Sequence, residues 1–125
     1  MFGNRRPVSP YVYPGLGVRR QGMIILDFVY DCCDALGVNY TDMVGKSRKQ
    51  EVVFARHSIS HCLRTREKKS YADIGRIFNR DHATAINAVK RWDNLLWAND
   101  YKAQDINLVV MQVYKRHNFK FNLHE

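Results

Sequence analysis

The sequence predicts an all-α fold, a small helical bundle that contains a helix-turn-helix. Two observations lead to this prediction. Apolar residues recur every three to four positions in several long segments, and no segment shows the alternation of a paired strand. Near the middle of the chain, Asn79-Arg80-Asp81 separates two such segments by a turn of a few residues. The 125 residues, 46% of them hydrophobic, are enough for one domain with a modest core.

Before this turn the periodicity predicts a first helix over residues 23–36, ended by Gly37 as a left-handed C-terminal residue. A single short turn is expected over residues 41–45, followed by a basic loop over residues 46–50. The inward side of the first helix is predicted to consist of Ile24, Ile25, Phe28, Val29, Cys32 and Leu36.

Residues 50–66 are predicted to form a long helix, and residues 102–119 a closing helix. Arg56, His57 and Arg64 are expected on the outer face of the long helix. The residues predicted to point inward are Val52, Val53, Ala55, Ile59, Cys62 and Leu63 in the long helix, and Ile106, Val109, Val110 and Val113 in the closing one.

The helix-turn-helix is predicted from its caps. Ser70 is a good N-cap for the first helix, and Asp73 occupies the position of a capping-box acid. Asp81 should cap the second helix and favour its positive end. The predicted apolar face of the first helix is Ala72, Ile74, Ile77 and Phe78; that of the second is Ala85, Ile86, Val89, Trp92 and Leu96, with Thr84, Asn87, Lys90, Arg91 and Asn94 opposite.

The start of the second helix, Asp81-His82-Ala83-Thr84, holds side chains of the types that read DNA bases. Asp accepts from cytosine N4, His and Thr bond base edges or phosphates, and an Ala or Thr methyl contacts a thymine methyl. A helix-turn-helix reads DNA with the second of its helices. By pattern alone, an ordinary helical hairpin with a polar cap is an equally good interpretation.

Charge favours DNA binding over the ordinary hairpin. The chain has 20 Lys and Arg against 12 Asp and Glu, a formal charge of +8. Residues 46–69 hold eight basic and two acidic side chains, directly before the helix-turn-helix. Residues 23–45 hold four acids and no base, and are expected to form a solvated acidic face. A clustered basic patch beside a reading helix is typical of a DNA-binding domain.

Three segments are predicted: a basic, Pro- and Gly-rich flexible arm over residues 1–22, the folded domain over residues 23–119, and a tail over residues 120–125. No stretch is apolar enough for a membrane span or a signal peptide. The three cysteines, Cys32, Cys33 and Cys62, have no zinc or disulfide spacing, which favours reduced thiols in a cytoplasmic protein.

Residues for catalysis are few. The chain has no Gly-rich phosphate loop and no G-x-S-x-G, so we expect neither an enzyme nor a bound nucleotide or other cofactor. His57 and His61 lie four residues apart beside Cys62, which is weak support for a metal site, and no metal is expected.

Several motifs together carry a family resemblance. They are Gly37-Val38, the run 40–49 that ends in Lys46-Ser47-Arg48-Lys49, Ala55-Arg56-His57, the run 71–78 and Arg80-Asp81-His82-Ala83-Thr84-Ala85-Ile86. In this order and almost without gaps, residues 23–113 resemble the C-terminal DNA-binding domain of the bacterial replication initiator DnaA. The resemblance implies that domain's Trp-repressor-like helix-turn-helix fold.

The resemblance also implies roles. Arg48, flanked by Lys46 and Lys49, would enter the minor groove, while Asp81, His82 and Ala83 would read bases in the major groove. Phosphates would be held by Arg56, Arg64, Thr84 and Lys90, and Asn87 is a further candidate contact. Two positions depart from the family pattern: His57 replaces a usual Gln, and Ala83 replaces a Thr or Ser, which suggests an altered DnaA-box preference.

Two functions remain open at this stage. The first is sequence-specific binding of double-stranded DNA, at a DnaA-box-like site, in replication or transcription control. Because the initiator's ATPase domain does not precede the matching residues, no ATPase activity is expected. The second is an interaction protein, of phage or mobile-element origin, that keeps the fold and binds a protein or RNA with its basic face. A protein partner in a replication or transcription complex is compatible with both.

Overall fold

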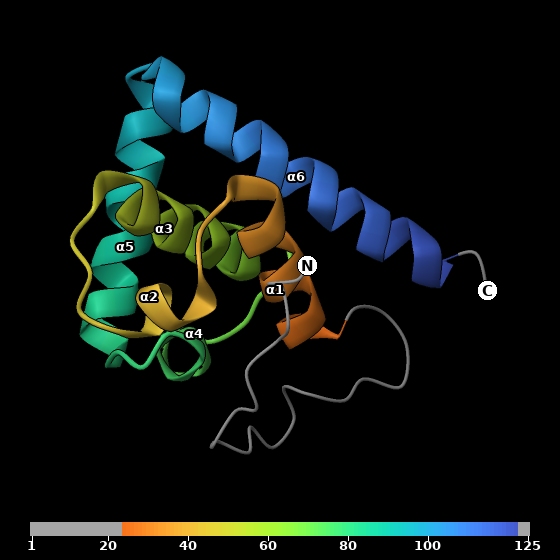
Figure 1. Ribbon diagram of the computed structural model, residues 1–125, viewed down its shortest axis with the longest axis horizontal. Helices are drawn as coiled ribbons and strands as arrows, with labels where there is room; N and C mark the ends of the chain where they lie inside the picture. The colour runs from red at the N-terminus through yellow and green to blue at the C-terminus, as the bar shows by residue number, and fades with distance from the viewer. Residues whose placement is uncertain (1–23, 123–125) are drawn as a thin grey trace.

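The computed structural model describes residues 24–122, with side chains placed up to His117, and within these residues it is entirely helical (Figure 1). The predicted arm over residues 1–22 and the last residues of the predicted tail lie outside this range. The helices are α1 (Ile25–Leu36), α2 (Tyr40–Val44), α3 (Gln50–Thr65), α4 (Tyr71–Ile77), α5 (His82–Trp97) and α6 (Tyr101–Asn122). The predicted all-α fold class is confirmed.

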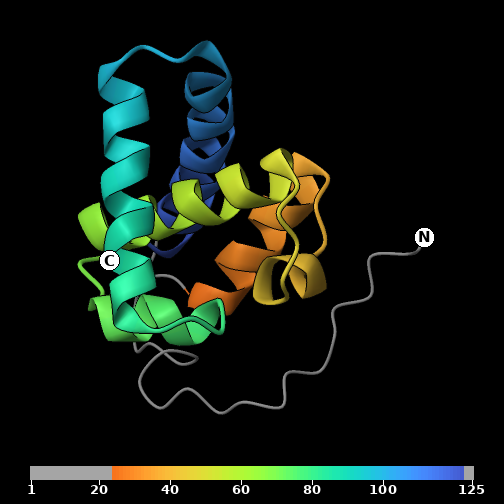
Figure 2. The same cartoon turned by 90° about the vertical axis from the view of Figure 1, so that its left-hand side faces the viewer.

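Helix α3 forms the centre of the domain. Helices α5 and α6 both pack against it, and α1 packs against α6 and α3. The short α4 lies beside the lower end of α5, whereas the short α2 packs on α3 (Figures 1 and 2). The ring of Phe54 on α3 meets the ring of Trp92 on α5 edge-on, with centroids 5.4 Å apart. Trp92 is completely buried, so this contact lies inside the core and holds α5 against α3.

Helix α6 closes the other side of the core. Phe28 of α1 meets Tyr114 of α6 edge-on, with ring centroids 5.9 Å apart. The Tyr114 hydroxyl donates to the carboxylate of Glu67 at 2.9 Å, and the imidazole of His117 contacts Asp31 at 2.6 Å. These contacts explain part of the acidic segment after residue 23: Asp31 faces α6 and is not a purely solvated group.

The predicted stop of α1 is confirmed. Gly37 has φ of 72°, and the backbone N–H of Val38 donates to the carbonyl of Cys33 at 3.0 Å. This is the Schellman arrangement that a glycine permits without strain. The closing helix α6 begins one residue before the predicted start, because Asp100 accepts from the N–H of Ala103 at 2.9 Å and caps it, and it continues to Asn122.

The helix-turn-helix is formed by α4, the turn 78–81 and α5. Ser70 caps α4 by accepting from the N–H of Asp73 at 3.1 Å, as predicted, and Asp73 pairs with Arg76. Asn79 has φ of 58°, the left-handed conformation that Asn tolerates. One predicted core residue was wrong: Ala72 is exposed, and the buried Gly75 takes its place on the inner face.

Gly75 is required by the tightness of this turn. The N–H of Arg80 donates to the carbonyl of Gly75 at 2.7 Å. A Cβ on residue 75 would overlap the carbonyl oxygen of Arg80 and lie 3.0 Å from that of Asp81. Because both neighbours are backbone atoms, they cannot rotate away as a side chain would. The start of α5 can therefore approach α4 this closely only when residue 75 lacks a side chain.

We expect Gly75→Ala to lower the free energy of unfolding by about 1–3 kcal/mol, since the added methyl group must push the turn open. Urea denaturation followed by circular dichroism measures this change. Gly37→Ala is the control: nothing lies within 4 Å of the new Cβ, so only left-handed backbone strain of about 1 kcal/mol is expected. An unchanged urea midpoint for Gly75→Ala would show that the turn is not tightly packed.

Candidate nucleic-acid interface

Helix α5 has one buried and one exposed face. Ala85, Ala88, Val89 and Trp92 are buried, while Ile86 and Leu96, also predicted to be buried, are half-buried. The candidate DNA-contacting residues of this helix are all exposed, namely His82, Ala83, Thr84, Asn87 and Lys90. Since no other element covers them, the first two turns of α5 present a continuous polar strip to solvent.

Asp81 caps α5, as predicted. Its Oδ1 accepts from the backbone N–H of Thr84 at 2.9 Å. This backbone bond and a hydrogen bond from the Thr84 hydroxyl lower the pKa of Asp81, so the carboxylate is ionised at neutral pH. A carboxylate has two oxygens, and only Oδ1 receives the cap bond. Capping and acceptance of a further hydrogen bond are therefore compatible in this residue.

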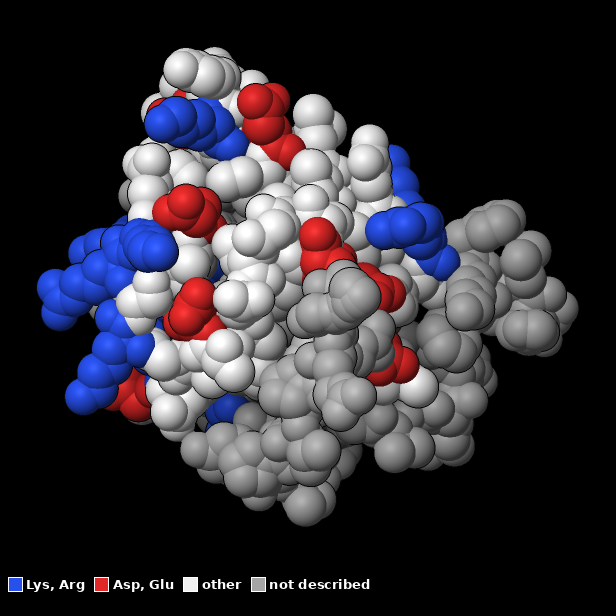
Figure 3. Space-filling view, in the orientation of Figure 1, with Lys and Arg blue, Asp and Glu red and all other residues white. Residues whose placement is uncertain are grey.

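The basic loop 46–49 stands beside this strip. Lys46, Arg48 and Lys49 are exposed. Lys and Arg side chains gather along the edge of the molecule that holds this loop and α5 (Figure 3). Between the loop and the turn 78–81 runs an open groove of about 450 Å³, lined by Val44, Gly45, Lys46, Ser47, Arg48, Arg56, Asn79 and Arg80. A groove with this lining is suited to a polyanion.

The prediction for Arg56 was partly wrong. Arg56 was expected on the outer face of α3, but it is 9% exposed, and its Nη1 donates to the carbonyl of Met43 at 3.0 Å. Burial and the positive charge of Arg80 lower the pKa of Arg56. The cause of the burial is α2, which packs over this part of α3 and offers its last carbonyls to the guanidinium. The sequence periodicity of α3 contains no sign of that contact.

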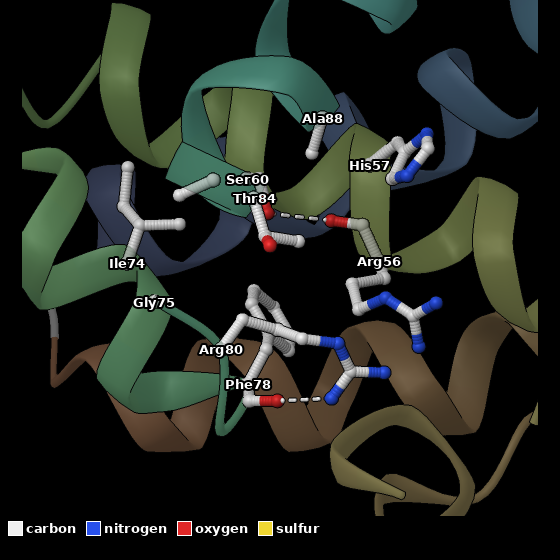
Figure 4. Close-up of a pocket in the computed structure, with 10 residues that line it drawn as sticks. Arg56, His57, Ser60, Ile74, Gly75, Phe78, Arg80, Thr84 and Ala88 are labelled. Atoms are coloured by element: carbon white, nitrogen blue, oxygen red, sulfur yellow. Dashed lines mark hydrogen bonds between the residues drawn. The ribbon is translucent and has the colours of Figure 1, made fainter. Parts of the chain in front are cut away.

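His57 belongs to α3 and lies on the side of that helix that faces α5. With Thr84 and Ala88 it lines a small cavity of about 60 Å³ beneath the start of α5 (Figure 4). Burial, together with the charges of Arg56 and Arg91, lowers the pKa of His57 to about 4. The imidazole is therefore neutral at pH 7. A neutral histidine is closer to the Gln of the family pattern than a cation would be, because it can both donate and accept.

Arg64 stands at the other end of α3, close to the start of α4. Its Nη1 donates to the carbonyl of Lys69 at 3.1 Å, and its guanidinium lies over the ring of Tyr71 at 4.3 Å from the centroid. These contacts hold the side chain in one orientation without neutralising its charge. Arg64 is only partly buried, so the cation remains available at the surface.

The histidine pair considered as a metal site is not assembled as one. His61 Nε2 faces Asp93 at 3.3 Å, whereas His57 faces the cavity under α5. Among the residues that the structure describes, no three His, Cys, Asp or Glu side chains converge on one point. The three cysteines are buried and unpaired, and burial raises the pKa of Cys33 and of Cys62 to about 12.

Sequence reasoning missed Arg80 as a residue of this interface. Its Nη2 donates to the carbonyl of Gly45 at 2.6 Å and its Nη1 to that of Phe78 at 2.9 Å. Asn79 also reaches α2, with its Nδ2 3.5 Å from the carbonyl of Val44. The sequence offered one local indication of this role, which is the position of Arg80 in the turn. It contains no sign that Arg80 contacts a residue 35 positions away.

The tight turn, the capped second helix and its exposed polar strip define the helix-turn-helix class of domain. The model of the bacterial DnaA protein helix-turn-helix family matches residues 25–91, and the chain belongs to this family. No described helix has the length and apolar character needed to cross a membrane.

The curated relatives are chromosomal replication initiator proteins. The DnaA of Mycoplasma pneumoniae is 32% identical over 78 residues, which are 62% of this chain and 18% of that protein. DnaA 1 of Chlamydia pneumoniae is 26% identical over 93 residues, 74% of this chain and 20% of that protein. The DnaA of the Wolbachia of Brugia malayi is 37% identical over 71 residues, 56% and 15% respectively. The chain thus spans at most a fifth of these relatives. No solved structure matches it significantly.

We expect the folded state to lose stability as the pH falls from 6.5 to about 4, because unfolded His57 takes up a proton in that range and folded His57 does not. Well above 6.5 the residue is neutral in both states and contributes no pH dependence. The loss should reach roughly 1–3 kcal/mol. Urea midpoints measured between these pH values for the wild type and for His57→Gln isolate the effect, since the Gln variant cannot titrate. If the urea midpoint falls equally with pH in the two proteins, the pKa of His57 is not lowered in the folded state.

Proposed function

We propose that this domain binds double-stranded DNA at a DnaA-box-like site, with the start of α5 in the major groove and the loop 46–49 in the adjacent minor groove. The observation that carries the proposal is the exposed strip of α5, led by Asp81, beside an exposed basic loop. A strand of phosphates separates a major from a minor groove. The basic groove of about 450 Å³ between the loop and the turn is the surface that this strand would cross.

Base reading is assigned to the first turn of α5. The carboxylate of Asp81, which can accept more hydrogen bonds than the cap uses, accepts from a cytosine amino group. His82 bonds a base edge, and the methyl group of Ala83 touches a thymine methyl. Arg48 reads the minor groove, whose narrow A·T-rich form attracts arginine. Because Ala83 lacks the hydroxyl found in the family pattern, the preferred site is expected to differ from a standard DnaA box at the base pair that residue 83 faces.

Phosphate contacts are assigned to the cations that the fold leaves exposed or partly exposed. These are Lys46, Lys49, Arg64 and Lys90, with the polar side chains of Thr84 and Asn87 beside them. Arg56 was included among the phosphate contacts on the resemblance alone. Its guanidinium lines the same groove but is largely buried, so we assign it a supporting role behind the loop.

The named relatives are chromosomal replication initiator proteins, and this chain matches at most a fifth of their length. We therefore propose DNA binding in the control of replication or transcription, without nucleotide hydrolysis by this domain. Such a protein acts where bacterial DNA lies, in the cytoplasm.

The affinity for duplex DNA should fall steeply with salt. About five cations in contact with DNA, one of them Arg48, give a slope of about −4 to −5 for log K against log salt. Fluorescence anisotropy with a labelled DnaA-box duplex measures this slope. Lys49→Ala should make the slope shallower by about 0.9. Arg116→Ala, an exposed cation on α6 on the opposite side of the domain, should leave it unchanged. Affinity that does not depend on salt would favour a protein partner.

Two substitutions separate base reading from phosphate binding. Asp81→Asn keeps the helix cap, since Asn caps as well as Asp, but presents a different bonding pattern to a base. We expect it to weaken the preferred duplex about tenfold and a scrambled duplex far less. Arg64→Ala should weaken both duplexes by a similar factor, because a phosphate contact carries no sequence information. Gel shifts with the two duplexes report both ratios.

If Asp81→Asn binds the preferred duplex with unchanged affinity and selectivity, Asp81 is only a helix cap. Asp81→Ala alone does not distinguish the two roles, because it removes the cap together with the base contact. A comparison of the melting temperatures of the Ala and Asn variants shows how much of any loss of binding comes from the cap.

A further inference from the structure

The last carbonyl groups of α2 are bound by guanidinium groups from two other parts of the chain. Arg56 of α3 donates to the carbonyl of Met43 at 3.0 Å, and Arg80 donates at 2.6 Å to the carbonyl of Gly45, the residue that directly follows α2. Arg80 also lies 3.4 Å from the carbonyl of Val44. The final carbonyls of a helix have no partner within the helix and carry its negative end, so cations are favourable there.

The donors of Arg80 are directed at carbonyl groups. Its Nη1 donates to the carbonyl of Phe78 at 2.9 Å within the turn (Figure 4). Its Nη2 donates to the carbonyl of Gly45, the residue that follows α2, so one planar group joins the two segments. The bond from Asn79 Nδ2 to Val44, at 3.5 Å, runs in the same direction. Both terminal nitrogens of the guanidinium therefore face backbone carbonyls, and these bonds use at least two of its five N–H donors.

The two segments joined in this way are those that the proposed function places in different grooves. Gly45 is followed three residues later by Arg48, the minor-groove residue. Arg80 itself directly precedes Asp81, the cap and first reading residue of α5. The loop 46–49 has no regular structure of its own. The position of the loop is set at one end by the end of α2 and at the other by Lys49, whose carbonyl accepts from the N–H of Val53 at 2.9 Å in the first turn of α3.

We propose that Arg80 is a specificity-determining positioning residue, which contacts the α2 carbonyls and not DNA, and which places Arg48 at the right distance from α5 to read both grooves at once. The inference rests on the proposed DNA binding and deepens it. It assigns part of the sequence discrimination at the minor-groove base pairs to a residue that touches none of them.

A double-mutant cycle between Arg80 and Arg48 tests this proposal. The probe is the duplex that the wild-type chain selects from a randomised pool, and dissociation constants are measured for the wild type, Arg48→Ala, Arg80→Ala and the double variant. Arg48→Ala should weaken the wild type about tenfold. In the Arg80→Ala background it should have less than about a twofold effect, because the arginine is no longer held over its base pair.

Two controls define what the coupling means. Asn87→Ala, on the exposed strip of α5, should have the same effect in both backgrounds, because α5 is held by α3 and not by Arg80. Arg116→Ala removes the same charge far from the interface. Arg48→Ala should therefore change the dissociation constant by the same factor in the Arg116→Ala background as in the wild type. Single base-pair substitutions along the duplex should show that Arg80→Ala loses discrimination at the minor-groove positions and keeps it at those read by α5.

Other results overturn the proposal. If the effects of Arg80→Ala and Arg48→Ala simply multiply, and Arg80→Ala weakens selected and scrambled duplexes alike, Arg80 is a phosphate contact. If the wild type selects no duplex, the proposed function itself fails. Where circular dichroism shows that Arg80→Ala is unfolded, Arg80→Lys replaces it in the cycle. Lysine keeps the charge but has no planar fork to join Gly45 with Phe78. If Arg48→Ala weakens binding by the same factor in the Arg80→Lys background as in the wild type, the positive charge of residue 80 is sufficient to place Arg48, and the planar fork is not needed.

Discussion

The contact on which the arrangement of this domain depends is the binding of the α2 carbonyls by Arg56 and Arg80. Helix α2 has only five residues, too few to be stable alone, and its last carbonyls need partners when α3 and the turn pack over them. Two guanidinium groups provide these partners. As a result, α2, the centre of α3 and the turn of the helix-turn-helix are held as one unit, and the basic loop begins from a fixed point.

This use of arginine divides the positive charge of the domain into two groups. Arg56 and Arg80 are directed inward at carbonyls, and burial, together with the nearby charge of Arg80, lowers the pKa of Arg56. Lys46, Arg48 and Lys49 remain exposed, and Lys46 and Arg48 line the open groove. The inner cations hold the backbone segments of the surface in place, and the outer cations provide its positive electrostatic potential. A count of basic residues along residues 46–69 does not distinguish the two groups.

The position of α5 is fixed by a small number of packing contacts beneath it. Gly75 lets the turn approach α4, and Trp92 packs on Phe54 further along the same helix. Between these two contacts lies the small cavity that His57 lines. The position of α5 thus depends on tight packing at two points and on a neutral, half-buried imidazole between them. Substitutions at His57 are expected to act on stability as well as on any contact that the residue makes with DNA.

The sequence by itself determined the helical segments, the caps at Ser70 and Asp81, the left-handed Gly37, the turn at Asn79 and the exposed strip of α5. All of these follow from interactions between residues no more than about four positions apart, which a single sequence displays directly. The resemblance to the DnaA domain, carried by motifs such as Asp81-His82, was confirmed by the family match over residues 25–91.

Only the tertiary structure decided which face of each helix is covered, and therefore which residues are buried. Ala72 was predicted to be buried and is exposed, and Arg56 was predicted to be exposed and is buried. The joining of Arg80 to Gly45 links residues 35 positions apart. The reason is physical: helical periodicity shows that a helix has two faces, but the neighbour that covers each face is chosen by packing between distant segments. A guanidinium can satisfy its donors with water, phosphate or backbone carbonyls, and only the fold determines which of these it meets.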